Sequence, residues 1–153
     1  MTSFKAWYFK AGESKVKLID YVPSYKNTQA LLQCDTIDSQ TIHTDKGIFT
    51  IYFNDNGRWE DKVFNKPASQ VLGKLPIQWA NMNGNYIVEC STSAVDDEDY
   101  DYIPCDMPSI GFKEWIDLCS TVMRESQKRS AERYKAEGFK EVFNSGGFSV
   151  SVA

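Results

Sequence analysis

The sequence predicts an α+β protein in which an antiparallel β-sheet packs against a long C-terminal α-helix. Up to about residue 92, short runs of β-branched and aromatic residues are separated by Gly-, Asn- and Pro-containing turns, which is typical of strands. After Ser109, apolar residues recur every three or four positions, as on one face of a helix. The length of 153 residues suits one domain. We expect residues 1–144 to form this domain and residues 145–153 to be a flexible tail.

The N-terminal part predicts a β-hairpin followed by a short helix. Aromatic residues crowd the stretch from Phe4 to Lys10, and Lys15 to Val22 alternates polar and apolar side chains for most of its length. The turn between them favours antiparallel pairing. Pro23 ends the second strand, because proline lacks the backbone donor that a ladder needs. Either Asn27 or Thr28 is expected to cap the short helix that follows.

The clearest strand signal is the β-branched and aromatic run from Ile48 to Phe53. Asn54 to Gly57 follows it, and its Asn-Gly pair suits a tight turn with positive φ. The sequence therefore predicts a hairpin in which Trp59 to Phe64 is the returning strand. A helical turn is expected after Asn65, and the run from Asn85 to Cys90 predicts the next strand.

The C-terminal third predicts one long helix with Ser109 as its N-cap. Its apolar side is formed by Phe112, Trp115, Ile116, Cys119, Val122 and Met123. From Arg124 to Lys135, seven charged residues in twelve leave little apolar face, so the helix is expected to continue as a solvated rod or to fray. Gly138 marks its expected end, because glycine is costly inside a helix.

The composition limits the classes of protein that the chain can belong to. Apolar residues make up 42%, charged residues 25% and aromatic residues 14%, which excludes wholesale disorder. The net charge of −4 argues against a protein that mainly coats phosphate backbones. No apolar stretch approaches the roughly 20 residues that span a bilayer, and no signal-peptide core is present. We therefore expect a cytoplasmic protein that binds no membrane.

The most distinctive charged feature is an acidic segment with interleaved tyrosines. It comprises Asp96, Asp97, Glu98, Asp99, Tyr100, Asp101 and Tyr102. A solvated loop is the simplest interpretation, and a calcium loop is disfavoured because the segment lacks the central glycine of such loops. The third interpretation is a binding surface, since tyrosines offer large contact areas and carboxylates pair with Arg or Lys. It predicts a protein partner with a basic surface.

Other chemistry-bearing residues give weaker indications. The basic residues between Arg124 and Lys135 are interspersed with glutamates, so a solvated helix face is favoured over a nucleic-acid contact. His43 is the single histidine, which excludes multi-histidine metal sites, and we expect no cofactor. The cysteines lack any Cys-x-x-Cys pair, so reduced and mostly buried thiols are expected. They are Cys34, Cys90, Cys105 and Cys119.

The stretch from Ile37 to Cys90 resembles an uncharacterised family that is common in phages and mobile elements, domain of unknown function 3846. Three motifs carry the resemblance: an Asn-x-x-Gly turn after a strand, an Asn-x-Pro-Ala motif and a Gly-x-aromatic-aliphatic strand. They correspond here to Asn54 and Gly57, to Asn65, Pro67 and Ala68, and to Gly84, Tyr86, Ile87 and Val88. The resemblance implies an accessory protein of a phage or mobile element in a bacterial host cell, and it supplies no catalytic residues.

These observations favour a non-catalytic interaction protein, an inhibitor of a bacterial nucleic-acid-processing or defence protein that acts through the acidic segment. The first alternative is a small-molecule or nucleotide-binding module with a pocket between sheet and helix, lined by Trp59, Trp79 or Trp115. The second alternative is a small enzyme that uses a cysteine and His43.

Overall fold

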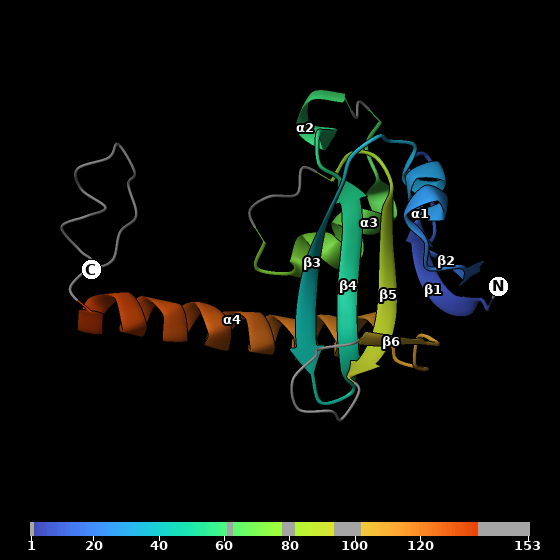
Figure 1. Ribbon diagram of the computed structural model, residues 1–153. Coiled ribbons are helices and arrows are strands. Elements are labelled where there is room, and N and C mark those ends of the chain that lie inside the picture. Colours follow the sequence, from blue (N-terminus) through green and yellow to red (C-terminus); the bar gives the residue numbers. More distant parts are fainter. Residues whose placement is uncertain (1, 61–62, 78–81, 94–101, 138–153) are drawn as a thin grey trace.

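The computed structural model describes residues 2–60, 63–77, 82–93 and 102–137, and the side chains of Arg58, Trp59 and Glu137 are not described (Figure 1). The strands form one sheet in the order β2-β1-β5-β4-β3, and β6 pairs with β5. All pairings are antiparallel. The strands are β1 (Phe4–Phe9), β2 (Lys17–Tyr21), β3 (Ile37–Thr44), β4 (Gly47–Asn54), β5 (Tyr86–Ser93) and β6 (Tyr102–Cys105).

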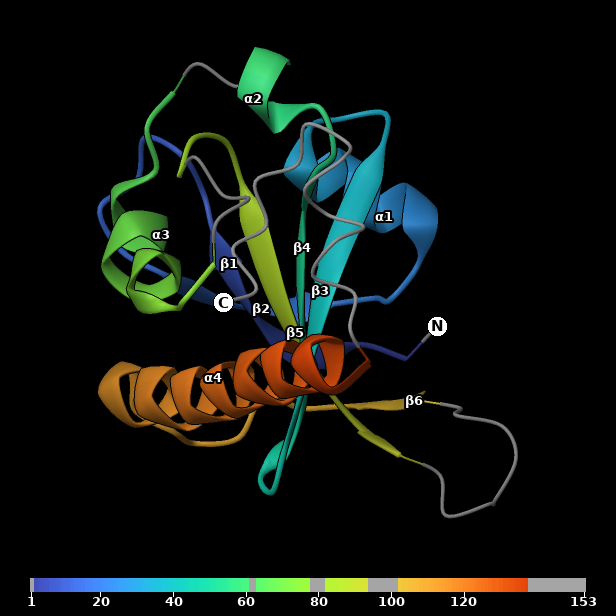
Figure 2. The same ribbon diagram turned by 90° about the vertical axis from the view of Figure 1, so that its left-hand side faces the viewer.

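Helices cover both faces of the sheet. They are α1 (Tyr25–Leu32), α2 (Gly57–Glu60), α3 (Lys66–Val71), the 3₁₀ turn η1 (Leu72–Lys74) and α4 (Phe112–Glu137). Figure 2, which views the sheet from the β3 side, shows α3 and α4 on one face and α1 on the other. We call these the α4 face and the α1 face. The predicted α+β class, with an antiparallel sheet packed against a long C-terminal helix, is confirmed.

The main core lies on the α4 face and is organised around Trp115. This side chain is fully buried, and its ring packs edge-on against Trp7 and Phe49 at centroid distances of 5.2 and 5.8 Å. Cys119 and Met123 continue the buried side of the helix toward β3. The predicted apolar face of the helix is therefore confirmed, and it joins α4 to β1 and β4.

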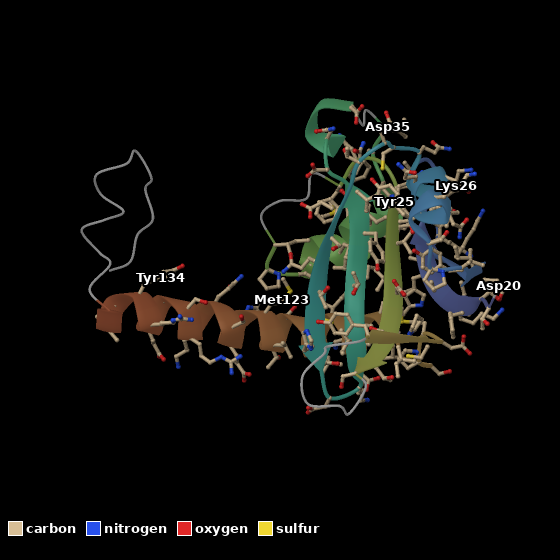
Figure 3. The ribbon with its side chains drawn as sticks, in the orientation of Figure 1. Asp20, Tyr25, Lys26, Asp35, Met123 and Tyr134 are labelled. Carbon is tan, nitrogen blue, oxygen red and sulfur yellow. The ribbon has the colours of Figure 1, made fainter. Side chains whose placement is uncertain are left out.

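The second half of α4 projects beyond the sheet. Residues 124–136 are exposed, and Figure 3 shows Met123 beside β3 but Tyr134 well past it. The expected solvated continuation of the helix is confirmed as far as Glu137. Gly138 and the predicted tail of residues 145–153 lie outside the described residues. No helix in the described part of the chain is long and apolar enough to cross a bilayer.

The predicted hairpin between Ile48–Phe53 and Trp59–Phe64 is wrong. β4 pairs instead with β3 on one side and β5 on the other. After β4, the side chain of Asn54 accepts a hydrogen bond from the backbone N–H of Asn56 at 3.0 Å, and the chain enters the short helix α2. The signal was ambiguous because Asn and Asp side chains support helix starts as well as reverse turns.

Three further boundaries differ from the expectation. Ser24 caps α1, since its hydroxyl accepts the backbone N–H of Asn27 at 3.1 Å, while Thr28 is directed to the Tyr21 hydroxyl. The helix α4 begins at Phe112, and the backbone N–H of Trp115 donates to the Gly111 carbonyl, so Gly111 precedes the first helical residue and the predicted N-cap, Ser109, is wrong. The sheet also extends past residue 92, because β6 adds a strand that the sequence did not indicate.

Asn65 links two of the motifs behind the family resemblance, the Asn-x-Pro-Ala motif to which it belongs and the motif that begins at Gly84. Its side-chain oxygen accepts the backbone N–H of Ala68 at 3.0 Å and so caps α3. Its amide nitrogen donates to the carbonyls of Phe9 and Gly84 at 2.9 and 2.7 Å. Pro67 lies in the first turn of α3, where a missing N–H costs nothing. The motif residues thus join α3 to β1 and to the start of β5.

Candidate functional site

Of the predicted acidic site, the structure places Tyr102, the first residue of β6. Asp96, Asp97, Glu98, Asp99, Tyr100 and Asp101 lie outside the described residues. Tyr102 is 43% exposed, and Ile103 beside it is 50% exposed. Both large side chains therefore project into solvent directly after the five carboxylates in the sequence.

Tyr102 contacts His43, the single histidine of the chain. The Tyr102 hydroxyl lies 3.1 Å from Nε2 of His43, and the ring centroids are 5.7 Å apart. His43 is paired with Ile48, and Ile48 with Ser91, so these three residues share the α1 face of the sheet. The contact therefore reaches from β6 across β5 and β4 to β3, a relation that the sequence does not indicate.

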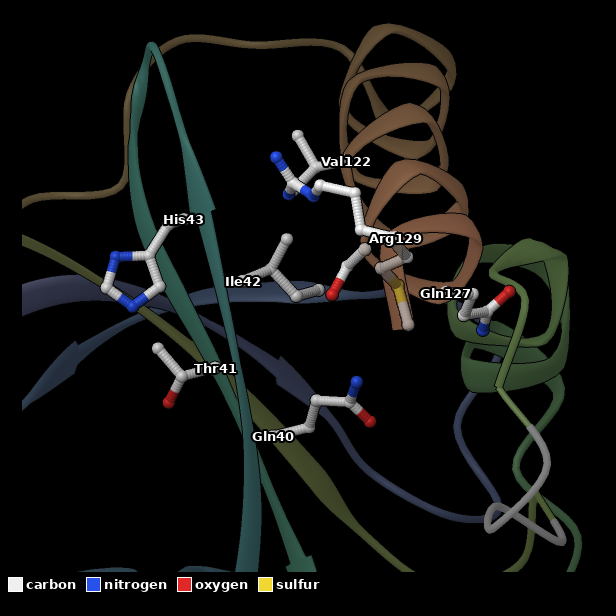
Figure 4. A pocket seen from close by; sticks show the side chains of 9 residues that line it. Gln40, Thr41, Ile42, His43, Val122, Gln127 and Arg129 are labelled. Carbon is white, nitrogen blue, oxygen red and sulfur yellow. The ribbon is translucent and has the colours of Figure 1, made fainter. Parts of the chain in front are cut away.

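A groove lies where α4 passes β3, the outer strand of the sheet. It has a volume of about 310 Å³. Figure 4 shows the side chains of Gln40 and Ile42 directed toward the helix and that of His43 directed away. The residues that line it are Gln40, Thr41, Ile42, His43, Val122, Met123, Ser126, Gln127 and Arg129. The groove combines apolar side chains from Ile42, Val122 and Met123 with polar side chains and one cation, Arg129.

A buried polar cluster occupies the α1 face. Glu89 is 7% exposed, and its carboxyl group is hydrogen-bonded to the hydroxyl of Tyr52. Burial raises the pKa of Glu89, and the bond from Tyr52 opposes part of that rise. Burial and the carboxylate likewise raise the pKa of Tyr52. Buried carboxyl groups with a raised pKa also occur at functional sites.

A shallow pocket of about 260 Å³ lies beside this cluster, between the sheet and α1. Three tyrosines wall it: Tyr21 and Tyr52 from the sheet, and Tyr25 from the first turn of α1. Burial raises the pKa of Tyr21 to about 12, while a hydrogen bond with Thr28 opposes the rise. Tyr25 is 61% exposed and forms the accessible wall. The pocket is at the small end for a ligand site.

The tryptophan pocket expected between sheet and helix is not formed by Trp115. That side chain is packed in the core rather than against a cavity. The side chains of Trp59 and Trp79 lie outside what the structure describes. The groove beside α4 and the pocket beside α1 are both lined by residues other than tryptophan.

The cysteines have their described contacts away from His43. His43 is paired with Ile48, and both lie on the α1 face. Cys90 is paired with Phe49, the residue after Ile48, so it lies on the opposite face because successive side chains of a strand alternate. Cys34 donates to the Thr36 carbonyl at 3.3 Å, and Cys119 is buried in the core. The geometry thus gives the proposed Cys–His nucleophile no support. No disulfide joins the four cysteines, and Cys90 and Cys119 are buried, whereas Cys34 and Cys105 are only partly buried.

Cys90 and Cys105 lie directly opposite each other on β5 and β6. Their sulfurs are 3.5 Å apart, although the residues are 15 positions apart in the sequence. Burial raises the pKa of Cys90 to about 12, and the hydrogen bond with Cys105 acts in the same direction. Within the described residues, no group of three or more His, Cys, Asp or Glu side chains could hold a metal ion.

Comparison with protein-family models, with curated proteins and with solved structures found no match to this chain.

Proposed function

We propose that this chain is a non-catalytic interaction protein of a phage or mobile element, and that it inhibits a bacterial nucleic-acid-processing or defence protein in the host cytoplasm. The contact is made by the acidic-aromatic segment, residues 96–102. The resemblance of residues 37–90 to a family common in phages and mobile elements supports the proposal that the protein comes from such an element. The segment itself supports the kind of partner, a protein with a basic surface.

The observation that carries the proposal is the exposure of Tyr102 and Ile103 at the end of five carboxylates. Tyr102 and Ile103 project from opposite faces of a short strand, and each offers apolar contact area of the kind found at interface centres. The adjacent carboxylates supply long-range attraction to Lys and Arg. Together they combine an anchor with a charge that steers the encounter.

The inhibitory mechanism follows from the same charges. A partner that processes nucleic acid holds phosphates with basic side chains, and carboxylates can pair with those side chains in the same way. Residues 96–102 then occupy a basic groove as a partial mimic of a phosphate backbone. The exposed cations of α4 are accompanied by Glu125 and Glu132, so nucleic acid is a less favoured partner for this protein.

The test is binding to a partner captured from bacterial lysate, purified and titrated against three versions of the full chain. The first is wild type. The second carries Asp→Asn at 96, 97, 99 and 101 and Glu98→Gln. The matched control neutralises five exposed carboxylates elsewhere: Asp35, Asp38, Asp117, Glu125 and Glu132.

We expect the first set of substitutions to weaken binding at least tenfold at low salt and the control set to weaken it much less, because rim charges act mainly when they face the partner. The wild-type affinity should also fall with salt. Equal affinity of all three proteins at both low and moderate salt would contradict the proposal.

The tyrosine-walled pocket favours a second candidate function, a small-molecule binding module. Its three aromatic walls suit a small organic cation. Choline and a nucleoside serve as cationic and planar probes in chemical-shift titrations. Tyr25→Ala removes the exposed wall without touching the core, so it should abolish any shift that this pocket causes.

A further inference from the structure

The opposed thiols on β5 and β6 meet the geometric conditions for a disulfide. Directly opposed residues of antiparallel strands have Cα atoms roughly 4.5–5.5 Å apart, inside the range of about 4.4–6.8 Å found for disulfides. Both side chains project from the same face, and the sulfurs are already 3.5 Å apart. Closing this gap to the bond length of about 2.0 Å needs side-chain rotation rather than movement of a strand.

The surroundings hold Cys90 in place for this reaction. A Cβ atom added at Gly47 on β4 would lie 2.8 Å from the Cys90 sulfur, so the absence of a side chain there provides the space that the thiol occupies. Cys90 is 2% exposed, whereas Cys105 is half-buried. One thiol is therefore reached from solvent and the other is fixed behind it.

We propose that Cys90 and Cys105 are a thiol oxidation site that reacts reversibly with low-molecular-weight disulfides such as glutathione disulfide. Cys105 is the attacking residue because solvent reaches it. Cys90 is the resolving residue, because it lies behind Cys105 and can form the second bond without leaving the core. The other two cysteines have no part in the reaction.

The reaction balances as two exchange steps. Cys105 loses its proton to water, and its thiolate attacks one sulfur of glutathione disulfide, so that a mixed disulfide forms and one glutathione thiolate leaves. Cys90 then loses its proton and attacks the Cys105 sulfur, and the second glutathione leaves. The two glutathione thiolates take up two protons from water, so the protein has given up two protons and two electrons, and glutathione disulfide has become two molecules of glutathione.

The bond would join the two strands that flank residues 94–101. The disulfide would fix β6 against β5, and with it the position of Tyr102, the described residue of the proposed contact, and so lower the entropy lost on binding. This consequence rests on the proposed function, whereas the oxidation itself does not. Partner affinity and disulfide formation are therefore measured separately.

The experiment incubates the reduced full-length protein with excess glutathione disulfide, then unfolds it in an alkylating reagent. We expect two labels instead of four and a melting temperature raised by about 5–10 °C, both reversed by dithiothreitol. Trypsin leaves both cysteines in one peptide, because no Lys or Arg lies between Lys74 and Lys113. A protease specific for Asp and Glu cuts between them and gives two peptides that only the disulfide links.

Three variants assign the roles. Cys90→Ala should stop at a mixed disulfide that adds one glutathione. Cys105→Ser should take up three labels whether or not it has been treated with glutathione disulfide, because its three remaining cysteines stay reduced. Cys34→Ser should form the disulfide as wild type does. Four labels in oxidised wild type, or a linkage between other cysteines, would overturn the proposal whether or not Cys90→Ala folds. A linked pair with unchanged partner affinity would leave the oxidation site standing and remove its effect on binding.

Discussion

The hydroxyl of Tyr102 lies 3.1 Å from Nε2 of His43, so the first residue of β6 contacts the outer strand of the sheet. The two residues are 59 positions apart, and β5 and β4 lie between their strands. The contact fixes where the described end of the acidic-aromatic segment lies relative to the rest of the sheet. The hydroxyl group of Tyr102 makes this contact, whereas its ring is exposed, so the two parts of the side chain can be tested by different substitutions.

Replacing Tyr102 should therefore distinguish the ring from the hydroxyl. Tyr102→Phe loses the hydrogen bond to His43 at an exposed site, and we expect the free energy of unfolding to fall by less than about 1 kcal/mol. Tyr102→Ala also removes the exposed ring, and it should weaken partner binding about tenfold, mainly through faster dissociation. Urea unfolding and binding kinetics measure the two effects. Wild-type dissociation rates in both variants would show that the ring lies outside the interface.

Asn65 offers a test of the structural role of the resemblance motifs. Asn65→Ala removes the cap of α3 and leaves the carbonyls of Phe9 and Gly84 without their amide donor. We expect the free energy of unfolding to fall by about 2–4 kcal/mol. Asn56→Ala is the control, because that side chain bonds Thr36 at an exposed position. Equal destabilisation by the two changes would contradict the role of Asn65.

Trp115 tests the packing of the long helix. Trp115→Ala should lower the free energy of unfolding by about 3–5 kcal/mol, because it empties the centre of the main core. Trp115→Phe should cost less, since it keeps an aromatic ring and the indole N–H has no hydrogen-bond partner among the described residues. Denaturant unfolding measures both. An unchanged melting temperature for Trp115→Ala would be incompatible with the packing against Trp7 and Phe49.

The sequence was informative where a local pattern has one structural meaning. The helical spacing around Trp115 identified the packed face of α4, and the alternation before Pro23 identified β2. Asn54 to Gly57 was uninformative because its side chains serve both turns and helix starts. The strand β3 was missed as the partner of β4, since an outer strand with exposed Asp38 and Ser39 lacks a continuous apolar pattern.

The site was less accessible to sequence reasoning than the fold. Local charge identified residues 96–102 as a distinctive segment, but the contact of Tyr102 with His43 depends on strand order, which no local pattern specifies. The pairing of Cys90 with Cys105 depends on the register of β5 and β6 in the same way. Spacing along the chain gave no reason to select these two of the four cysteines.

Glu89 makes stability depend on pH in a predictable direction. Burial raises its pKa in the folded protein above the usual value of 4.5, so the folded state binds the proton more tightly than the unfolded state. The contribution of Glu89 to stability is therefore fully present below pH 4.5 and is lost as pH rises toward the folded-state pKa. Glu89→Gln keeps the shape of the group but removes its titration.

The free energy of unfolding of Glu89→Gln, relative to wild type, should accordingly increase as pH is raised from about 4.5 to 7.5. Urea unfolding at several pH values measures this difference. Glu125→Gln is the matched control, because that carboxylate lies on the exposed part of α4 and its change should leave the difference flat. Parallel pH profiles for wild type and Glu89→Gln would contradict the prediction, because they would show that the carboxyl group of Glu89 has the same pKa in the folded and unfolded states.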